Sequence, residues 1–323
     1  MKVLGLGEVM IQLNPISKGP LRHANVFERH VAGSEANVII GMSRLGFSCR
    51  FLTVVGNDEF GKAVVSTLKS EGVDTKYIKV KEDYPTAVYF VQRGFPVPGR
   101  TEVFYYRKGS AFSTLSPEDI EVICFQDASL FHVSGITPAL SPNCKSATLK
   151  AVELARKNGI KVSFDTNIRK KLLPTPGEAL RCLRDFIESA DYLITGQGDL
   201  NYIFPDLDMI DQLKNLAKIA SNHKLIVVKM GKGGASACVN KKLIHSSSYV
   251  VEVVDELGAG DAFDAAFLSS ILSGKDVDEA LKFANAAGAL VVGALGDIEP
   301  LPGWRELETF ISFQEADKEG LLR

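Results

Sequence analysis

Short apolar runs alternate along the chain with segments in which apolar residues recur every three or four positions. Residues 3–13 form an apolar run punctuated by glycines, which predicts a buried strand followed by a turn. Residues 34–45 carry apolar side chains at helical spacing, and Gly46 follows as a helix stop. The N-terminal part of the chain is therefore predicted to form a strand and then a helix.

The same alternation continues toward the C-terminus. Residues 51–55 predict a strand, and residues 59–70 predict a helix that Gly72 ends. Further strands are predicted where short apolar runs follow helix-like stretches, at residues 161–165, 191–195 and 225–229. Strands that alternate with helices over this length are typical of a mostly parallel sheet covered on both faces, so the chain is predicted to be an α/β protein.

One region breaks this rhythm. Residues 86–111 alternate apolar and polar positions in the manner of strands, with a connection rich in glycine and proline between them. They predict an antiparallel flap added to the main sheet. Because no repeat, low-complexity tract or linker interrupts the chain, we expect one domain, residues 1–323, with a β lid formed mainly by residues 86–111 and part of 10–32.

Composition excludes some classes of function. Of the 323 residues, 46% are apolar and 24% are charged, as in ordinary soluble proteins, and a net charge of −2 gives no support for nucleic-acid or membrane binding. The five cysteines form no CxxC and have no nearby histidine, so no metal site is expected. Glu8 comes too early for a signal peptide, and the longest apolar run, residues 286–295, is too short to span a bilayer. We therefore expect a cytoplasmic protein.

The segment VVDELGAGDAFDAAF, residues 253–267, carries the first candidate chemistry. Gly258, Ala259 and Gly260 precede an apolar helical run, and a glycine-rich turn into a helix presents backbone N–H groups that suit a phosphate. Asp261 would repel a phosphate but can act as a base that takes a proton from an attacking hydroxyl. The alternative is an ordinary helix start, in which Asp261 merely favours the N-terminus.

A second glycine-rich segment is VVKMGKGGAS, residues 227–236. Gly231, Gly233 and Gly234 follow a predicted strand end and are candidates for holding a nucleotide, because the chain contains no GxxxxGK[ST] and GLGE at 5–8 lacks the third glycine of a dinucleotide fingerprint. The alternative is a hairpin turn with a basic tip.

Four motifs occur in one order along the chain: AGSEAN (32–37), VGNDEFG (55–61), KMGKGG (229–234) and DELGAGDAF (255–263). Over essentially the whole chain they resemble the ribokinase-like (PfkB) sugar kinases, in which GAGD is the most specific signature. The resemblance implies a ribokinase-like three-layer sandwich, with a mostly parallel central sheet, helices on both faces and a small β lid.

The resemblance also implies roles for the GAGD segment. Asp261 would be the catalytic base, and the amides of Gly258, Ala259 and Gly260 would form the anion hole. Such enzymes are phosphotransferases with an alcohol group as acceptor and Mg-ATP as donor. Phosphoryl transfer depends mainly on positioning and charge stabilisation, which a base and an anion hole supply.

Within the family, residues 19–38, 105–111 and 164–169 look most like the 2-keto-3-deoxygluconate kinases, which feed an Entner–Doudoroff-type route. This likeness implies phosphorylation of the terminal hydroxyl of a sugar acid. A carboxylate on the substrate calls for charge-assisted donors, for which arginine is well shaped. The implied substrate-binding residues are Gly33, Asn37, Tyr89, Tyr105, Arg107, Asn167, Arg169, Asp261 and Asp297.

For ATP, the resemblance implies one wall at residues 229–234 and another at residues 283–293, where small side chains let a base lie against a helix. The implied ATP-binding residues are Lys229, Gly231, Gly233, Gly234, Gly258, Ala259, Gly260 and Asn285. Magnesium would be held by ATP oxygens and water, without a protein cage.

The sequence departs from the family pattern in one segment, and a second family element is matched only in part. Glu256 and Leu257 stand where relatives commonly have threonine, in a segment that helps several of them hold a monovalent cation, which makes activation by such a cation doubtful. The Asn-x-x-Glu element, linked in the family to magnesium-bound water, is matched only by Asp199.

Several alternatives stay open. The chain could be a kinase for a neutral sugar such as fructose or ribose, or a sugar- or nucleotide-binding protein without activity; a nucleoside kinase is less favoured, because two arginines suit a carboxylate better than a purine. The sequence does not distinguish gluconate from galactonate epimers. We expect a homo-oligomer that assembles through the lid.

Overall fold

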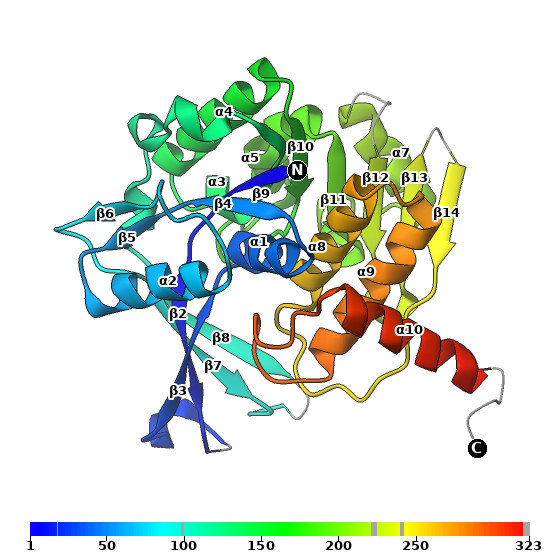
Figure 1. Ribbon diagram of the computed structural model, residues 1–323, viewed down its shortest axis with the longest axis horizontal. Helices are drawn as coiled ribbons and strands as arrows, with labels where there is room; N and C mark the ends of the chain where they lie inside the picture. Colours follow the sequence, from blue (N-terminus) through cyan, green and yellow to red (C-terminus); the bar gives the residue numbers. More distant parts are fainter. Residues whose placement is uncertain (18, 98–99, 221–224, 240–241, 319–323) are drawn as a thin grey trace.

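The computed structural model describes residues 1–17, 19–97, 100–220, 225–239 and 242–318 (Figure 1). An eight-stranded sheet runs through the centre, and its strands are parallel except at one edge, where the last three pair antiparallel. In spatial order the strands are β14 (Lys242–Ser246), β13 (Ala235–Val239), β12 (Leu225–Lys229), β11 (Tyr192–Gly196), β10 (Lys161–Asp165), β9 (Ala128–Ser134), β1 (Lys2–Leu6) and β4 (Ser48–Leu52).

Two apolar cores lie on the two faces of this sheet. Along β1, Val3 packs into one core and Leu4 into the other, because successive side chains of a strand point to opposite faces. The first core is covered by α1 (Ser34–Arg44), α2 (Glu59–Ser70), α8 (Ala259–Leu272), α9 (Val277–Val292) and α10 (Trp304–Lys318). The second is covered by α3 (Ile136–Ala139), α4 (Pro142–Lys157), α5 (Pro176–Ser189), α6 (Gln197–Ile203) and α7 (Met209–Ile219). This confirms the predicted three-layer α/β sandwich.

Local signals set most of these boundaries. The strands predicted at 161–165 and 225–229 are β10 and β12, and the helix predicted at 59–70 is α2. Asp58 caps α2 by accepting a 2.7 Å hydrogen bond from the backbone of Gly61. The turn at 229–234 joins the antiparallel strands β12 and β13, so the hairpin geometry considered from the sequence is present. Short 3₁₀ helices form at Leu21–His23, Phe112–Thr114, Pro117–Asp119, Val122–Phe125 and Gly231–Gly233.

A second, four-stranded sheet lies beside the end of the sandwich (Figure 1). Its order is β3 (Phe27–Ala32), β2 (Met10–Pro15), β7 (Val88–Arg93) and β8 (Thr101–Tyr106), and a small third sheet pairs β5 (Val54–Gly56) with β6 (Lys79–Lys81). The antiparallel pairing of β7 with β8 agrees with the alternation in residues 86–111. We call this four-stranded sheet the lid sheet.

The lid sheet turns one face toward the segment that precedes α8. Gln12, Tyr89 and Tyr105 are direct cross-strand neighbours, so their side chains share one side of the sheet. Tyr89 packs in a small apolar cluster that Leu257 covers. Among the described residues, no helix is both long and apolar enough to cross a membrane.

Candidate active site

The N-terminus of α8 is shaped by a glycine that no other residue could replace without strain. Gly258 is the N-cap and adopts φ +76°, in the left-handed region. A Cβ atom there would lie only 2.9 Å from the backbone oxygen of Asp297. The first amides of a helix have no partner within the helix, and Ala259 and Gly260 line a pocket. This arrangement suits an anion that approaches the backbone.

Asp261 lies in the first turn of α8 and faces α1. One carboxylate oxygen accepts a 2.7 Å hydrogen bond from the Ser34 hydroxyl, and the other accepts a 2.8 Å bond from the Asn37 amide. Burial raises the pKa of Asp261 above its ordinary value, although these two donors oppose the shift. A fixed carboxylate with a raised pKa is suited to take a proton from a hydroxyl group.

Asn167, in the segment that follows β10, joins the same hydrogen-bond network. Its side-chain amide donates a 2.7 Å hydrogen bond to the Ser34 hydroxyl, which in turn donates to Asp261. Its backbone has φ +32°, a conformation that asparagine tolerates better than most residues. Sequence reasoning named Asn37 and Asn167 but missed Ser34; the signal was its place three residues before Asn37 on one helix face.

Tyr89, Tyr105 and Asp297 form a continuous line beside the α8 terminus. The two tyrosine rings lie 5.5 Å apart, and the Tyr89 hydroxyl is 3.5 Å from an Asp297 carboxylate oxygen. Burial, followed by the negative charges of Asp261 and Asp255, raises the pKa of Asp297 to about 7. Burial also raises the pKa of Tyr89, and Asp297 adds to this shift. The line therefore places a buried, partly protonated carboxyl next to the candidate base.

Arg107 completes the line, but its charge already has a partner. Its guanidinium lies over the Tyr105 ring at 5.3 Å and donates from Nε to a Glu8 carboxylate oxygen at 2.7 Å. The Glu8 side chain is only 2% exposed and also accepts a 2.6 Å hydrogen bond from the Ser110 hydroxyl. Glu8 is thus a charged group of the site, whereas the sequence analysis used it only to exclude a signal peptide.

The remaining predicted substrate residues have different surroundings. Gly33 caps α1, and a Cβ atom there would lie 2.2 Å from the backbone oxygen of Glu8, so only glycine allows this approach. Arg169 follows Asn167 by two residues and is exposed; no described residue forms a hydrogen bond or ion pair with its guanidinium. Its place in the site stays a prediction.

Lys229, at the end of β12, is held between two buried carboxylates. Its ammonium group lies 2.9 Å from Asp165 at the end of β10 and 2.9 Å from Asp264 on α8, and 3.5 Å from the Gly260 oxygen. Burial alone would lower the pKa of Lys229, but the two carboxylates outweigh it and raise the pKa. The lysine therefore ties α8 to the sheet as well as lining the pocket.

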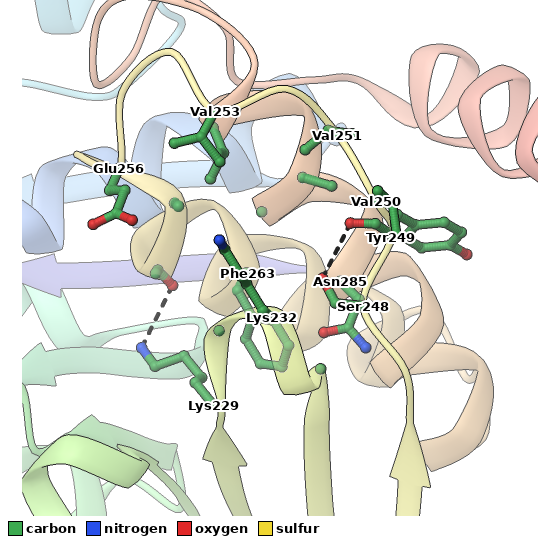
Figure 2. A pocket seen from close by; sticks show the side chains of 17 residues that line it. Lys229, Lys232, Ser248, Tyr249, Val250, Val251, Val253, Glu256, Phe263 and Asn285 are labelled. Atoms are coloured by element: carbon green, nitrogen blue, oxygen red, sulfur yellow. Dashed lines mark hydrogen bonds between the residues drawn. The ribbon is translucent and has the colours of Figure 1, made fainter. Parts of the chain in front are cut away.

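The pocket beside α8 has a volume of about 510 Å³ (Figure 2). Figure 2 shows Lys229 and Glu256 at one end and Tyr249, Ser248 and Asn285 at the other. Of the residues predicted to bind ATP, the pocket is lined by Lys229, Gly231, Gly234, Ala259, Gly260 and Asn285. Gly233 and Gly258 belong to the adjoining turns without lining it.

The donors and walls of this pocket fit a nucleotide. Apolar walls come from segments 249–253 and 288–292, which suit a flat base, while the α8 amides suit a phosphate. The Asn285 amide donates to the backbone oxygens of Ser246 and Ser247 at 3.0 and 3.3 Å, so it also holds the pocket wall in place.

For magnesium the described residues offer no ready cage: they contain no group of three or more His, Cys, Asp or Glu side chains arranged to hold a metal. Asp199, the residue matched to the magnesium-water element, accepts hydrogen bonds from the Thr166 hydroxyl at 2.6 Å and the Ile168 backbone at 3.1 Å. Burial raises its pKa. Both bonds reach the same oxygen, Oδ2, which therefore supports the loop after β10, and a role toward magnesium stays a prediction.

Comparisons with known proteins agree with this architecture. The model of the "pfkB family carbohydrate kinase" matches residues 1–304. A 2-dehydro-3-deoxygluconokinase of Thermoproteus tenax is 40% identical over 96% of this chain and 94% of its own. The crystal structure of 2-dehydro-3-deoxygluconokinase from Thermotoga maritima has a TM-score of 0.89 at 27% identity, covering 97% of this chain and 98% of that one.

A fructokinase from Vibrio cholerae O395, solved with fructose, ADP and a calcium ion, has a TM-score of 0.84 at 26% identity and covers 96% of this chain and 98% of its own. The family match spans both glycine-rich segments, residues 227–236 and the GAGD segment at 253–267. The protein is therefore a member of the pfkB family of carbohydrate kinases.

Proposed function

We propose that this protein is an ATP-dependent kinase that phosphorylates the terminal hydroxyl of 2-keto-3-deoxygluconate, also called 2-dehydro-3-deoxygluconate. The observation that carries the proposal is the position of Asp261. It stands beside the glycine turn of α8 with both carboxylate oxygens fixed by Ser34 and Asn37. A line of polar side chains that ends at Arg107 lies next to it.

In this proposal the Asp261 side chain and the backbone at the start of α8 have separate tasks. Asp261 accepts the proton of the attacking hydroxyl, and its raised pKa makes it a better base than an exposed aspartate. At the terminus, the amides of residues 258–260 stabilise negative charge on the transferring group. Bound Mg-ATP supplies the phosphoryl group and neutralises part of its charge.

The substrate end is assigned from the chemistry of the side chains. Asp297 and Tyr89 can exchange hydrogen bonds with sugar hydroxyls. Arg107 presents to the substrate carboxylate the N–H groups that Glu8 does not accept. Because Glu8 neutralises the charge of Arg107, the positive charge that attracts the carboxylate comes from Arg169, which pairs with no described residue. The likeness to the Thermoproteus and Thermotoga relatives supports an acid substrate.

A neutral sugar is the second candidate, and one contact favours it. Because Glu8 pairs with Arg107, the two side chains together carry a net charge close to zero. Such a pair suits a neutral hydroxylated sugar as well as an acid. The Vibrio relative that binds fructose supports this alternative.

The deciding experiment measures sugar-dependent release of ADP from Mg-ATP, with 2-keto-3-deoxygluconate, its galactonate epimer, fructose and ribose as acceptors. Preference for the keto-deoxy acids supports the proposal. Preference for fructose or ribose replaces it by the second candidate. Absence of sugar-dependent release with every acceptor contradicts a kinase of either kind and leaves a binding protein.

Three further expectations remain predictions. We propose that the lid sheet covers the sugar within a single-domain kinase, that the protein forms a homo-oligomer through that sheet, and that it works in the cytoplasm. Light scattering coupled to gel filtration tests the second of these directly.

A further inference from the structure

A buried ion pair connects the lid sheet to the segment that leads into α8. Arg93, at the end of β7, donates from Nε and Nη2 to one carboxylate oxygen of Asp255 at 2.8 and 2.5 Å. The Asp255 side chain is 0% exposed and that of Arg93 is 23% exposed. The sequence analysis did not single out Arg93 and included Asp255 only as the first residue of the DELGAGDAF motif, and neither residue lines the pocket beside α8.

The second oxygen of Asp255 holds the backbone of the same segment. It accepts a 3.2 Å hydrogen bond from the amide of Leu257, the residue directly before Gly258. The amides of Val254 and Asp255 donate to the backbone oxygen of Val292 at 2.9 and 3.2 Å. The entry to the glycine turn is therefore fixed by α9 on one side and by the Asp255 carboxylate on the other.

Arg93 determines how that carboxylate is oriented. Because both of its donors meet one oxygen, the other oxygen is left to face Leu257. Arg93 is itself fixed, since its Nη1 donates to the Asn14 side chain on β2 at 3.1 Å. The contact runs from two strands of the lid sheet to the turn, and Figure 1 shows the yellow segment before α8 passing the lid sheet.

We propose that Arg93 is a positioning residue for the anion hole, acting through Asp255 on the amides of residues 258–260. This inference rests on the proposed kinase function. A carboxylate buried without a cation does not keep its charge and geometry. Without Arg93, Asp255 loses its orientation, the Leu257 amide is released, and the turn is no longer held at the position that the transferring group requires.

The test compares Arg93→Ala, Arg93→Lys and Arg93→Ala/Asp255→Asn in the full chain, with whichever sugar the wild-type protein phosphorylates. We expect Arg93→Ala to lower kcat by roughly 10²-fold, as for one lost anion-hole donor, with the sugar KM changed less than about threefold. Arg93→Lys keeps the positive charge but cannot donate from both Nε and Nη2, so its kcat should lie between those of the wild type and Arg93→Ala. The double variant removes the unpaired buried charge, so its Tm should recover while kcat stays low.

Two controls separate positioning from a structural role. Lys81→Met breaks another partly buried ion pair, with Asp119, and should lower Tm without lowering kcat. Guanidinium ions at non-denaturing concentration should restore part of kcat in Arg93→Ala but not in the double variant, whereas equal concentrations of potassium or sodium chloride should not. If kcat recovers together with Tm in the double variant, or if guanidinium has no effect, Arg93 only supports the fold and the inference is wrong.

A measurement without turnover keeps this test independent of the proposed function. In hydrogen–deuterium exchange, amides 257–260 should lose protection in Arg93→Ala while peptides of α4 stay unchanged. Unchanged protection of these amides contradicts the inference, even if no sugar is phosphorylated. If amides 257–260 lose protection in Arg93→Ala but the wild-type protein phosphorylates no sugar, the contact through which Arg93 positions the turn is supported and only the proposed kinase function is rejected.

Discussion

The two halves of the candidate site are built in different ways. The phosphate half is a stretch of backbone, residues 258–260, shaped by one left-handed glycine and by the start of α8. The sugar half combines side chains from α1, from the lid sheet and from the loops after β1 and β10, with Asp297 near α9. A site made of backbone amides needs only adjacent residues, whereas a site made of side chains depends on partners that are far away along the chain.

This difference has a consequence for charge. Three cations around the sugar half and the turn each meet a buried carboxylate that their own segment does not contain: Glu8 for Arg107, Asp255 for Arg93, and Asp165 with Asp264 for Lys229. Buried charges are paired because an unpaired one is costly. Each pair therefore fixes a side chain and at the same time reduces the charge that it offers to a ligand.

The largest effect is expected at the junction of the halves. Asp261→Asn keeps the shape and the hydrogen bond from Ser34 but removes the base, so kcat should fall roughly 10²- to 10⁴-fold. The melting temperature should hold or rise, since a carboxylate with a pKa raised by burial is replaced. Steady-state kinetics and calorimetry check both; a kcat within tenfold of wild type would rule out Asp261 as the base.

Arg107→Met tests the side-chain half. The loss of a charge-assisted contact should lower kcat/KM for 2-keto-3-deoxygluconate roughly 10- to 100-fold, with a smaller loss for a neutral sugar. The variant also leaves Glu8 buried without its cation, at a cost of about 3–5 kcal/mol. The control is Glu8→Gln/Arg107→Met, which should recover stability but not activity. An equal loss of kcat/KM for acid and neutral sugars would mean that Arg107 does not bind the substrate carboxylate.

Gly258→Ala tests the backbone half against a matched position. The left-handed backbone costs about 1–2 kcal/mol for a residue with a Cβ, and contact with the Asp297 backbone should displace the turn and lower kcat roughly tenfold. Gly274 has φ +86° and no atom within 4 Å of a built Cβ. Gly274→Ala should therefore carry the cost of the left-handed backbone without this contact and keep full activity, and a similar kcat for both variants would contradict the turn's role.

The smallest expected effect is a pH dependence of the stability. The pKa of Asp297 is raised to about 7 in the folded protein, so between about pH 4 and pH 7 the folded state binds more protons than the unfolded state. Stability should fall as pH rises through this window and level off above it. Asp297→Asn should remove this part of the slope in Tm against pH, and an unchanged slope would show that Asp297 does not titrate there.

Much of the fold was readable from the sequence because its signals are local. The apolar runs of β10 and β12 and the helical spacing of α2 depend on neighbours a few residues apart, and the structure has them where they were predicted. The glycine of the GAGD turn is equally local, because a left-handed backbone constrains the residue that adopts it. The residues allowed Asp261 to be either a base or part of an ordinary helix start, the resemblance favoured the base, and that role stays a prediction.

The partners in the site were not readable in this way. Glu8 and Arg107 are 99 residues apart, and Arg93 and Asp255 are 162 residues apart. No local pattern in the residues between them predicts their meeting, which depends on the lid sheet packing against the end of the sandwich. The sequence by itself determined the layered fold and the glycine turn at α8. Only the tertiary structure decided which carboxylate neutralises each cation, because that choice is made by strands and loops that approach one another after the chain has folded.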